Sequence, residues 1–466
     1  MLYDAGKTTS SEEKTSEQEY LELIKGEYSH SKAFEILDKI EWDFKDFTTQ
    51  YLTHKFHSYP ARFIPHIPLT FIKLLTKEKE TIVDPFCGCG TTLVEAFLNN
   101  RHSIGNDFNP LSALISKVKT TLIDETELDE LNKRLAGING NLDLDNGKIK
   151  ERLSNMPSRK ISKLFDRNTV SHLEAIRETL LEINEDGYSD IYDLGRVALS
   201  STIWSLVEHG INDVKDTFLK KATQMENELK KTAKIVENIP NVTVINGDAR
   251  KLEIELESTD LIVTSPPYVN ALDYYRVHMY NMFWLDMDVA AFKKHEIGAH
   301  SRFINNRFRL LSEYLGDMLR SVIEMNRILK QGKFCVIVVG NSSLEFELIE
   351  SHKFLAEMSK KIGFKLIKTI FRNIDKTKKY TSADIGKIDD EYILVLQKIK
   401  KTNISSENDD FITENVTQEM LRFKEQLKRF QGTSIRGRKP TKERLLKNID
   451  KIDEALENIP QDATRS

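Results

Sequence analysis

A serine, two prolines and a tyrosine stand next to one another after an apolar run near the middle of the chain. The run Leu261-Ile-Val263 is typical of a buried strand, and it leads into Ser265, Pro266, Pro267 and Tyr268. The prolines fix the backbone and remove two amide donors, so the serine hydroxyl and a proline carbonyl can accept hydrogens from an amino group. The tyrosine ring offers a face for a planar group. This pattern predicts a site that orients an amine without a strong base, and a Pro-Pro turn without function is the alternative.

A glycine-rich turn between an expected strand and an expected helix predicts a cofactor loop. The strand-like run Thr81-Ile-Val-Asp84 leads into the turn, and ligands of open α/β sheets bind where such strands end. Glycines let the backbone approach a ligand, a threonine can cap the following helix, and the aspartate can meet an ammonium group. A lone Gly-x-Gly is equally consistent with a tight turn. The candidate cofactor residues are Asp84, Pro85, Phe86, Gly88, Gly90, Thr91 and Thr92.

Two more acidic residues at the ends of strand-like runs indicate a nucleoside ligand. Asp107 stands where nucleoside-binding sheets carry an acid that accepts hydrogen bonds from ribose. Asp248 and Ala249 end a third run, where a carboxylate can accept from an adenine amino group while a backbone amide donates to the ring. Single strand-end aspartates are more often caps or ion-pair partners. Because consecutive strand ends converge on one crevice, the three acids together predict an adenosyl ligand.

An adenosyl cofactor facing an amine predicts methyl transfer from a sulfonium. The exocyclic amine of cytosine or adenine is a poor nucleophile because its lone pair is delocalised into the ring, and acceptors such as Ser265 and the Pro266 carbonyl can localise it. A base inside a duplex must first be flipped out, and Tyr268 can stack against it. The chain lacks the Gly-Lys-Ser/Thr phosphate loop, the Gly-x-Ser-x-Gly elbow and a cysteine near the catalytic loop. These absences exclude nucleotide triphosphatases, serine hydrolases and C5-type cytosine methylases.

Alternating strand-like and helix-like segments predict an α/β fold, with a doubly wound, mainly parallel Rossmann-like sheet. Strand-like runs lie at 81–84, 103–107, 242–245, 261–264, 334–339 and 392–396, and an amphipathic helix covers 311–322. We expect a methyltransferase-type domain at 35–123 and 241–400, a helical insertion at 124–240, a polar N-terminal segment at 1–34 with order beginning near residue 35, and a polar linker with a basic helical tail at 401–466.

Composition limits the class of protein. The chain has 466 residues, 39% of them hydrophobic, and a net charge of −4, which allows a sizeable core and two or three structural units. Cys87, Cys89 and Cys335 are too few for a disulfide framework and lack the partners of a zinc site, so no metal is expected. No apolar run reaches the ~18 residues that span a bilayer, and residues 1–16 lack the apolar segment of a secretory signal. We therefore expect a cytoplasmic protein with no membrane partner.

The motifs resemble those of the amino-type DNA methyltransferases, the N4-cytosine and N6-adenine family. Asp84 to Gly90 is similar to the family's cofactor loop, Gly105-Asn-Asp107 to its ribose acid, Gly247-Asp248 to its adenine acid, and Ser265 to Tyr268 to its catalytic tetrad. The resemblance covers about residues 54–123 and 241–398. It implies S-adenosyl-L-methionine as cofactor, double-stranded DNA as substrate and a cognate restriction endonuclease as a partner.

Further details of the resemblance concern Tyr59 and the target base. His57 to Pro65 is similar to the segment that closes over the methionine end of the cofactor in the family, which implies a cofactor contact for Tyr59. Ser-Pro-Pro-Tyr is commoner among N4-cytosine enzymes than among N6-adenine enzymes, which favours cytosine. The alternatives are N6 of adenine, an RNA base N-methyltransferase, and a non-catalytic nucleic-acid-binding protein with this fold. The insertion at 124–240 is the candidate target-recognition region.

Two groups of residues are candidates for contact with nucleic acid. Residues 420–449 hold ten Lys or Arg and two Glu, a positive excess that can track phosphates. Within them, Arg436-Gly-Arg-Lys-Pro440 resembles a minor-groove hook. A solvated tail with scattered charges is the alternative. Nearer the catalytic loop, the candidates to flank the substrate are Tyr274, Tyr275, Arg276, Arg302, Arg307 and Arg309.

Overall fold

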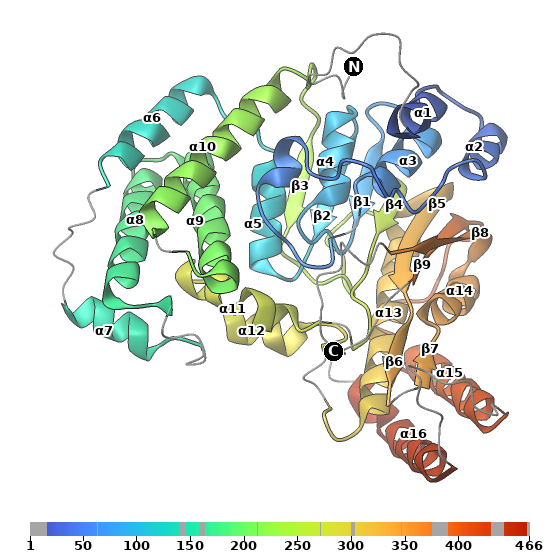
Figure 1. Cartoon of the computed structure of the whole chain (residues 1–466). Coiled ribbons are helices and arrows are strands. Elements are labelled where there is room, and N and C mark those ends of the chain that lie inside the picture. The colour runs from blue at the N-terminus through green and yellow to red at the C-terminus, as the bar shows by residue number, and fades with distance from the viewer. Residues whose placement is uncertain are drawn as a thin grey trace.

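A seven-stranded sheet forms the centre of the computed structural model (Figure 1). The structure describes residues 16–62, 64–138, 146–157, 164–211, 213–270, 272–299, 303–345, 347–374, 390–429 and 442–463. In spatial order the strands are β3 Val242–Ile245, β2 His102–Asn106, β1 Thr81–Asp84, β4 Thr259–Thr264, β5 Leu329–Gly340, β9 Asp390–Lys398 and β8 Phe364–Asn373. The first five are parallel, and β9 runs antiparallel to both of its neighbours. The predicted mainly parallel, doubly wound sheet is confirmed.

Helices cover both faces of the sheet, and the side chains of each central strand alternate between two cores. In β4, Ile262 packs in the core that contains α13 (Arg307–Ile328), whereas Leu261 and Val263 pack with α3 (His66–Leu75) on the opposite face. A strand that is buried on both faces reads as a continuous apolar run. The other helices next to the strands are α4 Thr91–Leu98, α5 Pro110–Lys119 and α14 Ser351–Ile362.

The prediction that order begins near residue 35 is wrong. Helix α1 (Ser16–Leu23) and helix α2 (His30–Leu37) precede that point. Tyr20 is buried, and its hydroxyl donates to the carbonyl oxygen of His66 at 3.0 Å. A few apolar side chains thus dock an otherwise polar segment on α3, because an amphipathic helix needs only one apolar face. The short helix η1 (Leu52–Lys55) follows.

The insertion is helical and shares a core with two helices that follow Ser265 to Tyr268, the predicted catalytic loop. Leu173, Leu194 and Phe218, from three helices of the insertion, pack in one cluster with Trp284 and Phe292. We call these seven helices the helical module (Figure 1): α6 Glu125–Ala136, α7 Asn146–Ser154, α8 Arg167–Glu185, α9 Ser189–His209, α10 Val214–Ala233, α11 Tyr274–Trp284 and α12 Val289–His295. Among the residues that the structure describes, no helix is long and apolar enough to cross a membrane.

The C-terminal region is helical, as predicted, and it packs against the sheet domain. Helix α15 (Asp409–Arg429) and helix α16 (Lys442–Ala463) place Val416, Met420 and Ile452 in the core around α13. Three strands lie outside the sequence prediction: the edge strand β8 and a hairpin of β6 (Ser342–Leu344) and β7 (Glu347–Ile349). β8 is only partly buried along its length, so its apolar signal is weak.

Candidate active site

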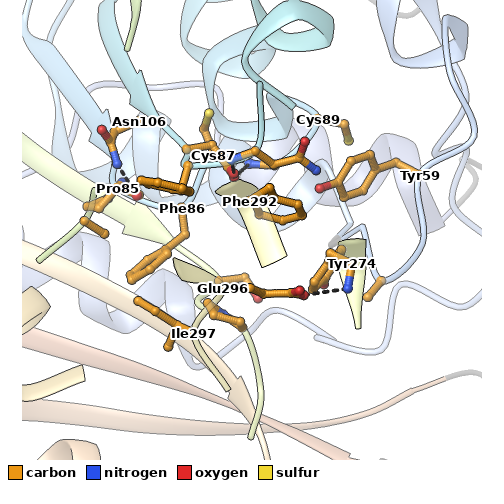
Figure 2. Close-up of a pocket in the computed structure, with 18 of the residues that line it drawn as sticks. Tyr59, Pro85, Phe86, Cys87, Cys89, Asn106, Tyr274, Phe292, Glu296 and Ile297 are labelled. Atoms are coloured by element: carbon orange, nitrogen blue, oxygen red, sulfur yellow. Dashed lines mark hydrogen bonds between the residues drawn. The ribbon is translucent and has the colours of Figure 1, made fainter. Parts of the chain in front are cut away.

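The carboxyl ends of four adjacent strands, β3, β2, β1 and β4, meet at one cavity (Figure 2). The empty space at this cavity, including the part that is open to solvent, is about 850 Å³. Residues from the predicted cofactor loop and from the predicted catalytic loop line this same space. They are Tyr59, Pro85, Phe86, Gly88, Thr91, Asp107, Asp248, Ala249, Ser265 and Pro267.

The turn between β1 and α4 brings its backbone to the cavity wall. Gly88 and Gly90 have φ values of +49° and +79°, a region that favours glycine. A Cβ atom on Gly90 would lie 2.8 Å from Ser116 Oγ, and this same hydroxyl donates to the Gly88 carbonyl at 2.9 Å. Gly90 does not line the cavity. It lets the turn close so that α4 begins at the wall with Thr91.

Two backbone amides hold Asp107 at the end of β2. The Gly88 amide donates to Oδ2 at 2.8 Å, and the Asn109 amide donates to Oδ1 at 2.9 Å. Burial raises the pKa of the Asp107 carboxyl to about 6, and the two amide donors oppose the rise. The group is therefore mainly ionised at neutral pH. Its remaining lone pairs can accept from two neighbouring hydroxyls, as a ribose diol presents them.

Asp248 is held by an arginine that sequence reasoning did not single out. Arg250 Nη2 donates to Asp248 Oδ2 at 2.7 Å, and Arg250 Nη1 donates to Asp317 Oδ1 of α13 at 2.9 Å. Burial opposes ionisation of Asp248, but the adjacent Arg250 outweighs it and lowers the pKa of the carboxyl. Asp248 therefore faces the cavity as a fixed anion. No local signal marks Arg250, since an arginine two residues after an acid is common on protein surfaces.

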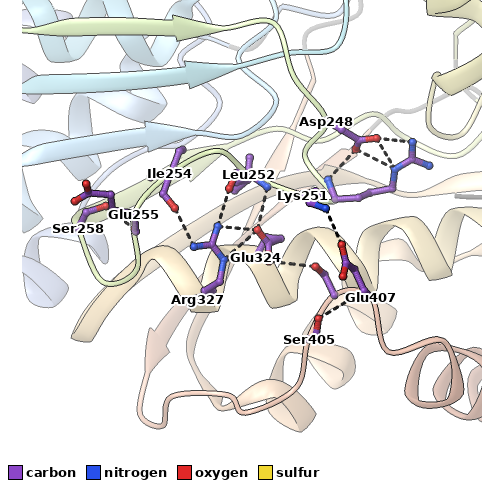
Figure 3. Close-up of polar contacts among 12 residues, drawn as sticks. Asp248, Lys251, Leu252, Ile254, Glu255, Ser258, Glu324, Arg327, Ser405 and Glu407 are labelled. Carbon is purple, nitrogen blue, oxygen red and sulfur yellow. Dashed lines mark hydrogen bonds and ion pairs between the residues drawn. The ribbon is translucent and has the colours of Figure 1, made fainter.

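The loop after Asp248 is clamped onto α13 (Figure 3). The Leu252 amide donates to Glu324 Oε2 at 2.9 Å, and Arg327 donates to the carbonyl oxygens of Leu252 and Ile254 at 2.7 and 2.9 Å. Glu324 also accepts from the Ser406 hydroxyl at 3.2 Å. The wall of the cavity at Asp248 is thus tied to the segment that leads into α15.

Three residues predicted to bind the cofactor or act in catalysis, Asp84, Thr92 and Pro266, lie behind the cavity wall. Side-chain hydrogen bonds link the end of β1 and the start of α4 to β4 there. The Thr264 hydroxyl donates to Asp84 Oδ1 at 2.6 Å, and the Thr92 hydroxyl donates to the Val263 carbonyl at 3.2 Å. Burial raises the pKa of Asp84 to about 6, although hydrogen bonds from Thr264, Thr92 and the Phe86 amide lower it. Asp84, Thr92 and Pro266 are all buried and do not line the cavity. The hydrogen bonds of the Asp84 and Thr92 side chains favour a bracing role for these two residues over ligand contact.

Tyr268 is anchored by residues from β9 and β8, the strands at the antiparallel edge of the sheet. Its hydroxyl donates to Glu391 Oε1 in β9 at 2.9 Å and lies 3.3 Å from Ser265 Oγ. Glu391 also pairs with Arg372 of β8. Tyr268 does not line the cavity and packs against the core around α13. Its ring is therefore fixed beside the cavity rather than inside it.

The hairpin β6–β7 braces the backbone directly after the tetrad. The Ser342 hydroxyl donates to the Val269 carbonyl at 2.7 Å, and the Asn270 side-chain amide donates to the Ser343 carbonyl at 3.1 Å. The Asn270 backbone amide donates to the Gly298 carbonyl at 3.2 Å. The predicted catalytic loop is thus held both by the hairpin and by the segment after α12.

The helical module supplies a wall of the cavity. Tyr274, Phe292 and His295 of the module line it, together with Glu296 and Ile297 directly after α12. Figure 2 shows Tyr274, Glu296 and Ile297 on the side of the cavity away from Cys87 and Cys89. Sequence reasoning named only the first of these, as a residue that flanks the substrate. The others lie on a helix and loop whose residue pattern has no known motif. Only the packing of α12 over the strand ends reveals them.

Several of the cations predicted to contact nucleic acid are already engaged by other side chains of the protein. In the C-terminal region, Lys424 pairs with Asp453, and Lys451 pairs with Glu345 at 3.0 Å. The hook at 436–440 lies outside the described residues, as does Arg302. Arg309 lies over the ring of Phe303, 4.6 Å from its centroid, and neither Arg309 nor Arg307 lines the cavity.

A pair of cations beside the cavity is more exposed. Arg276 and Lys293 flank the ring of Tyr275, 5.8 and 5.1 Å from its centroid. Both are exposed, as is Lys294. Arg276 Nε lies 3.5 Å from Asp273 Oδ2. This group, from α11 and α12, adjoins the residues that line the cavity.

Two relatives match most of their own length. The type II methyltransferase M.MvaI of Kocuria varians is 25% identical over 419 residues, which cover 75% of this chain and 92% of the relative. The type II methyltransferase M.MjaII of Methanocaldococcus jannaschii is 23% identical over 423 residues, or 67% of this chain and 77% of the relative. A crystal structure titled as a SAM-dependent methyltransferase from Methanosarcina mazei is 9% identical and covers 70% of this chain and 95% of that chain, with a TM-score of 0.30.

Two family models also match the chain. The model described as DNA methylase, of the N6/N4 type, matches residues 1–117 and 259–457, about two thirds of the chain. The model described as D12 class N6 adenine-specific DNA methyltransferase matches residues 66–307. Both matches include the glycine turn and the sequence Ser265 to Tyr268.

Proposed function

The chain belongs to the amino-type DNA methyltransferases, which use S-adenosylmethionine, and we propose that it methylates the N4 amine of cytosine in double-stranded DNA. The observation that carries this proposal is a single cavity lined by both Asp107 and Ser265. A nucleoside cofactor bound at the first residue and a base bound at the second would share one space, as direct transfer between them requires.

The residues that line the cavity fit this cofactor. Asp107 has lone pairs free for ribose hydroxyls, and Asp248 with the Ala249 amide suits the polar edge of adenine. Phe86 and Phe292 provide apolar surface for the ring. The acidic lining also matches the net positive charge of the cofactor. When bound, S-adenosylmethionine supplies a methyl group on a positively charged sulfur.

The hydrogen bonds around Tyr268 leave Ser265 as an acceptor. A tyrosine hydroxyl has one hydrogen, and Tyr268 donates it to Glu391. The contact between Tyr268 and Ser265 at 3.3 Å therefore uses the serine hydrogen. Lone pairs of the Ser265 oxygen remain for the incoming amine, and the Pro266 carbonyl is the second acceptor. Together they orient the amine and localise its lone pair without removing a proton first.

The helical module is our candidate for target recognition. Helix α11 begins six residues after the tetrad and shares its core with the insertion, so a DNA contact on the module would be transmitted directly to the catalytic loop. The exposed cations Arg276, Lys293 and Lys294 adjoin the cavity. We assign them to the phosphates that flank the flipped base.

N6 of adenine is the second candidate target, and the match to the D12 class N6 adenine-specific model favours it. The serine in the tetrad favours cytosine on the basis of the family pattern. Since M.MvaI and M.MjaII are both named type II methyltransferases, we also propose that a cognate restriction endonuclease accompanies the chain. The endonuclease would recognise the same DNA sequence.

Identification of the methylated nucleoside tests the function. Purified protein is incubated with methyl-labelled cofactor and genomic DNA, and the digested nucleosides are identified by mass spectrometry. We expect label in N4-methylcytosine; label in N6-methyladenine would support the second candidate instead. Total RNA serves as the parallel substrate, and transfer to RNA alone would overturn the assignment to DNA. A protein that binds the cofactor but methylates neither polymer would be a non-catalytic member of the family.

A further inference from the structure

Glu296 is a buried acid that faces the cavity and has no role in the mechanism above. It directly follows α12, has a relative exposure of 5% and lines the same cavity as Asp107 and Ser265. Figure 2 shows its side chain extending toward the start of α11 at Tyr274. An acid that is buried at a cavity wall needs a partner for its charge.

The backbone of α11 supplies two hydrogen-bond donors to the Glu296 carboxylate. The amides of Tyr274 and Tyr275 donate to the Glu296 carboxylate at 2.5 and 3.4 Å, while Asp273, the residue that caps α11, makes no side-chain cap bond. Glu296 thus caps a helix from outside it, which explains its orientation. Among the described residues it forms no ion pair, so capping leaves its charge without a cation.

The charges around the cavity favour a cationic ligand. Burial raises the pKa of Glu296 to about 8, the two amides oppose the rise, and nearby Asp273 and Asp107 add to it. A positive group in the cavity would reverse this balance and stabilise the carboxylate. The other titratable groups that line the cavity are Tyr59 and Arg62 from the segment before α3, Cys87 and Cys89 from the glycine turn, Asp107, Asp248, Tyr274 and His295.

We propose that Glu296 receives the positive charge of the methionine portion of the cofactor and makes the site prefer the charged substrate to its neutral product. The inference rests on the proposed function. S-adenosylmethionine carries a sulfonium and an ammonium against one carboxylate, whereas S-adenosylhomocysteine has a neutral thioether in place of the sulfonium. A carboxylate held by backbone amides at the cavity wall distinguishes these two by charge, so it favours release of the product after transfer.

Calorimetric binding of both ligands to wild-type protein and to Glu296→Gln tests this role. The glutamine keeps one acceptor oxygen for the α11 amides but carries no charge. We expect the affinity for S-adenosylmethionine to fall about tenfold and the affinity for S-adenosylhomocysteine to fall less than about threefold, since only the first ligand carries a sulfonium and a net positive charge. An equal loss for both ligands would reduce Glu296 to a structural cap and overturn the proposal.

Asp288→Asn provides the matched control. Asp288 caps α12 by accepting from the amides of Ala290 and Ala291, both at 2.9 Å, and it does not line the cavity. We expect this variant to keep both affinities and their ratio. A change in the ratio equal to that of Glu296→Gln would show that loosening the module is sufficient and would also overturn the proposal.

Proton release gives a second readout that does not depend on a variant. Binding of S-adenosylmethionine to the wild-type protein at pH 7 is measured in buffers of different ionisation enthalpy. Because binding would ionise Glu296, we expect proton release with the substrate and much less with S-adenosylhomocysteine. Equal release with both ligands would contradict the charge-sensing role. If the wild-type protein bound neither ligand, the proposed function itself would fail, which separates the two outcomes.

Discussion

The hydroxyl of Tyr268 donates to Glu391 Oε1 at 2.9 Å, although the two residues are 123 positions apart in the chain. The acceptor belongs to a buried pair with Arg372, so the tyrosine is held by the antiparallel end of the sheet. Burial raises the pKa of Tyr268 well above its ordinary value, with Glu391 adding to the effect. The residue therefore acts through its ring and its position, and its hydroxyl stays protonated.

Substitutions at Tyr268 separate the ring from the hydroxyl. We expect Tyr268→Phe to lose less than about tenfold in single-turnover methyl transfer, because the ring remains. Tyr268→Ala should lose about 100-fold or more, since a stacked base contributes on the order of 1–3 kcal/mol and the loop loses its anchor. Cofactor affinity should survive in both, because Tyr268 does not line the cavity. A fully active Tyr268→Ala would contradict the stacking role.

Ser265 is expected to contribute to transfer rather than to cofactor binding. Ser265→Ala removes one of two acceptors for the amine, and we expect the rate of the chemical step to fall about 100-fold, as for the loss of one preorganised polar group. The matched control is Ser258→Ala in the loop before β4, where the serine donates to the Glu255 carbonyl at 2.8 Å. Rapid-quench measurements with DNA in excess report the step directly. Unchanged transfer by Ser265→Ala would assign the amine to other acceptors.

Cofactor affinity should depend on pH through Asp107. Since burial raises the pKa of this carboxyl to about 6, protonation below that pH removes the acceptor for the ribose hydroxyls, and affinity should fall there. Asp107→Ala should bind more weakly at neutral pH and lose this dependence. Asp84→Asn is the control, because Asp84 also has a pKa of about 6 but does not line the cavity. Isothermal titration from about pH 5 to about pH 8 distinguishes them, because this range spans the ionisation of a carboxyl with a raised pKa. A flat profile in the wild type would argue against the ribose role.

Glu95 should make stability depend on pH. It is buried in α4, where the Tyr51 hydroxyl donates to it and His54 Nε2 lies 2.8 Å away. Burial raises the pKa of Glu95 from 4.5 to about 8. The unfolded chain loses this proton near the lower value and the folded protein only near the higher one, so the free energy of unfolding falls as pH rises between them.

Glu95→Gln cannot ionise and should escape this loss. We expect a stability close to wild type at about pH 4.5 and greater by on the order of 2–4 kcal/mol at about pH 9, measured by denaturant unfolding. Glu35→Gln on the exposed side of α2 is the control and should show no such gain. If the difference in the free energy of unfolding between Glu95→Gln and wild type were the same at both pH values, the pKa of Glu95 in the folded protein would not be raised.

The cations beside the cavity should dominate the salt dependence of DNA binding. We expect Arg276→Gln with Lys293→Gln to weaken binding and to reduce the slope of log affinity against log salt by about 0.9 for each phosphate that is no longer neutralised. Lys428→Gln in α15, where the lysine pairs with Glu425 at 2.8 Å, is the control. Fluorescence anisotropy at several salt concentrations measures both. If Lys428→Gln reduced DNA affinity and its salt dependence more than the double variant did, the phosphate contacts would be assigned to the C-terminal region instead.

Point substitutions are better suited to this question than truncation. Val416, Met420 and Ile452 are part of the core around α13, so removing the region from residue 415 would expose that core. A truncated protein would lose affinity through unfolding, whatever the role of its charges. Among the described residues of this region, Lys424 pairs with Asp453 and Lys428 with Glu425, so part of its positive charge is neutralised.

Local sequence was sufficient for the residues at strand ends. Asp107, Asp248 and Ser265 each follow a strand-like run, and the parallel arrangement of those runs predicted that they would meet at one edge of the sheet. The turn with Gly88 was equally visible, because its backbone conformation favours glycine. The strand-end acids and the glycine turn can be recognised from neighbouring residues in the sequence. Their meeting at one site follows from the rule that ligands bind at the carboxyl ends of parallel strands.

The partners of those residues were decided by tertiary structure alone. Glu391 reaches Tyr268 from the antiparallel strand β9, and Glu296 enters the cavity from the end of α12. Neither position follows a strand end or belongs to a motif, and their burial depends on which helix or strand packs against them. Sequence therefore determined the chemistry available at the crevice. Three-dimensional packing decided which acids surround it and which cations stay free, because the energy of a charge depends on the groups around it in space.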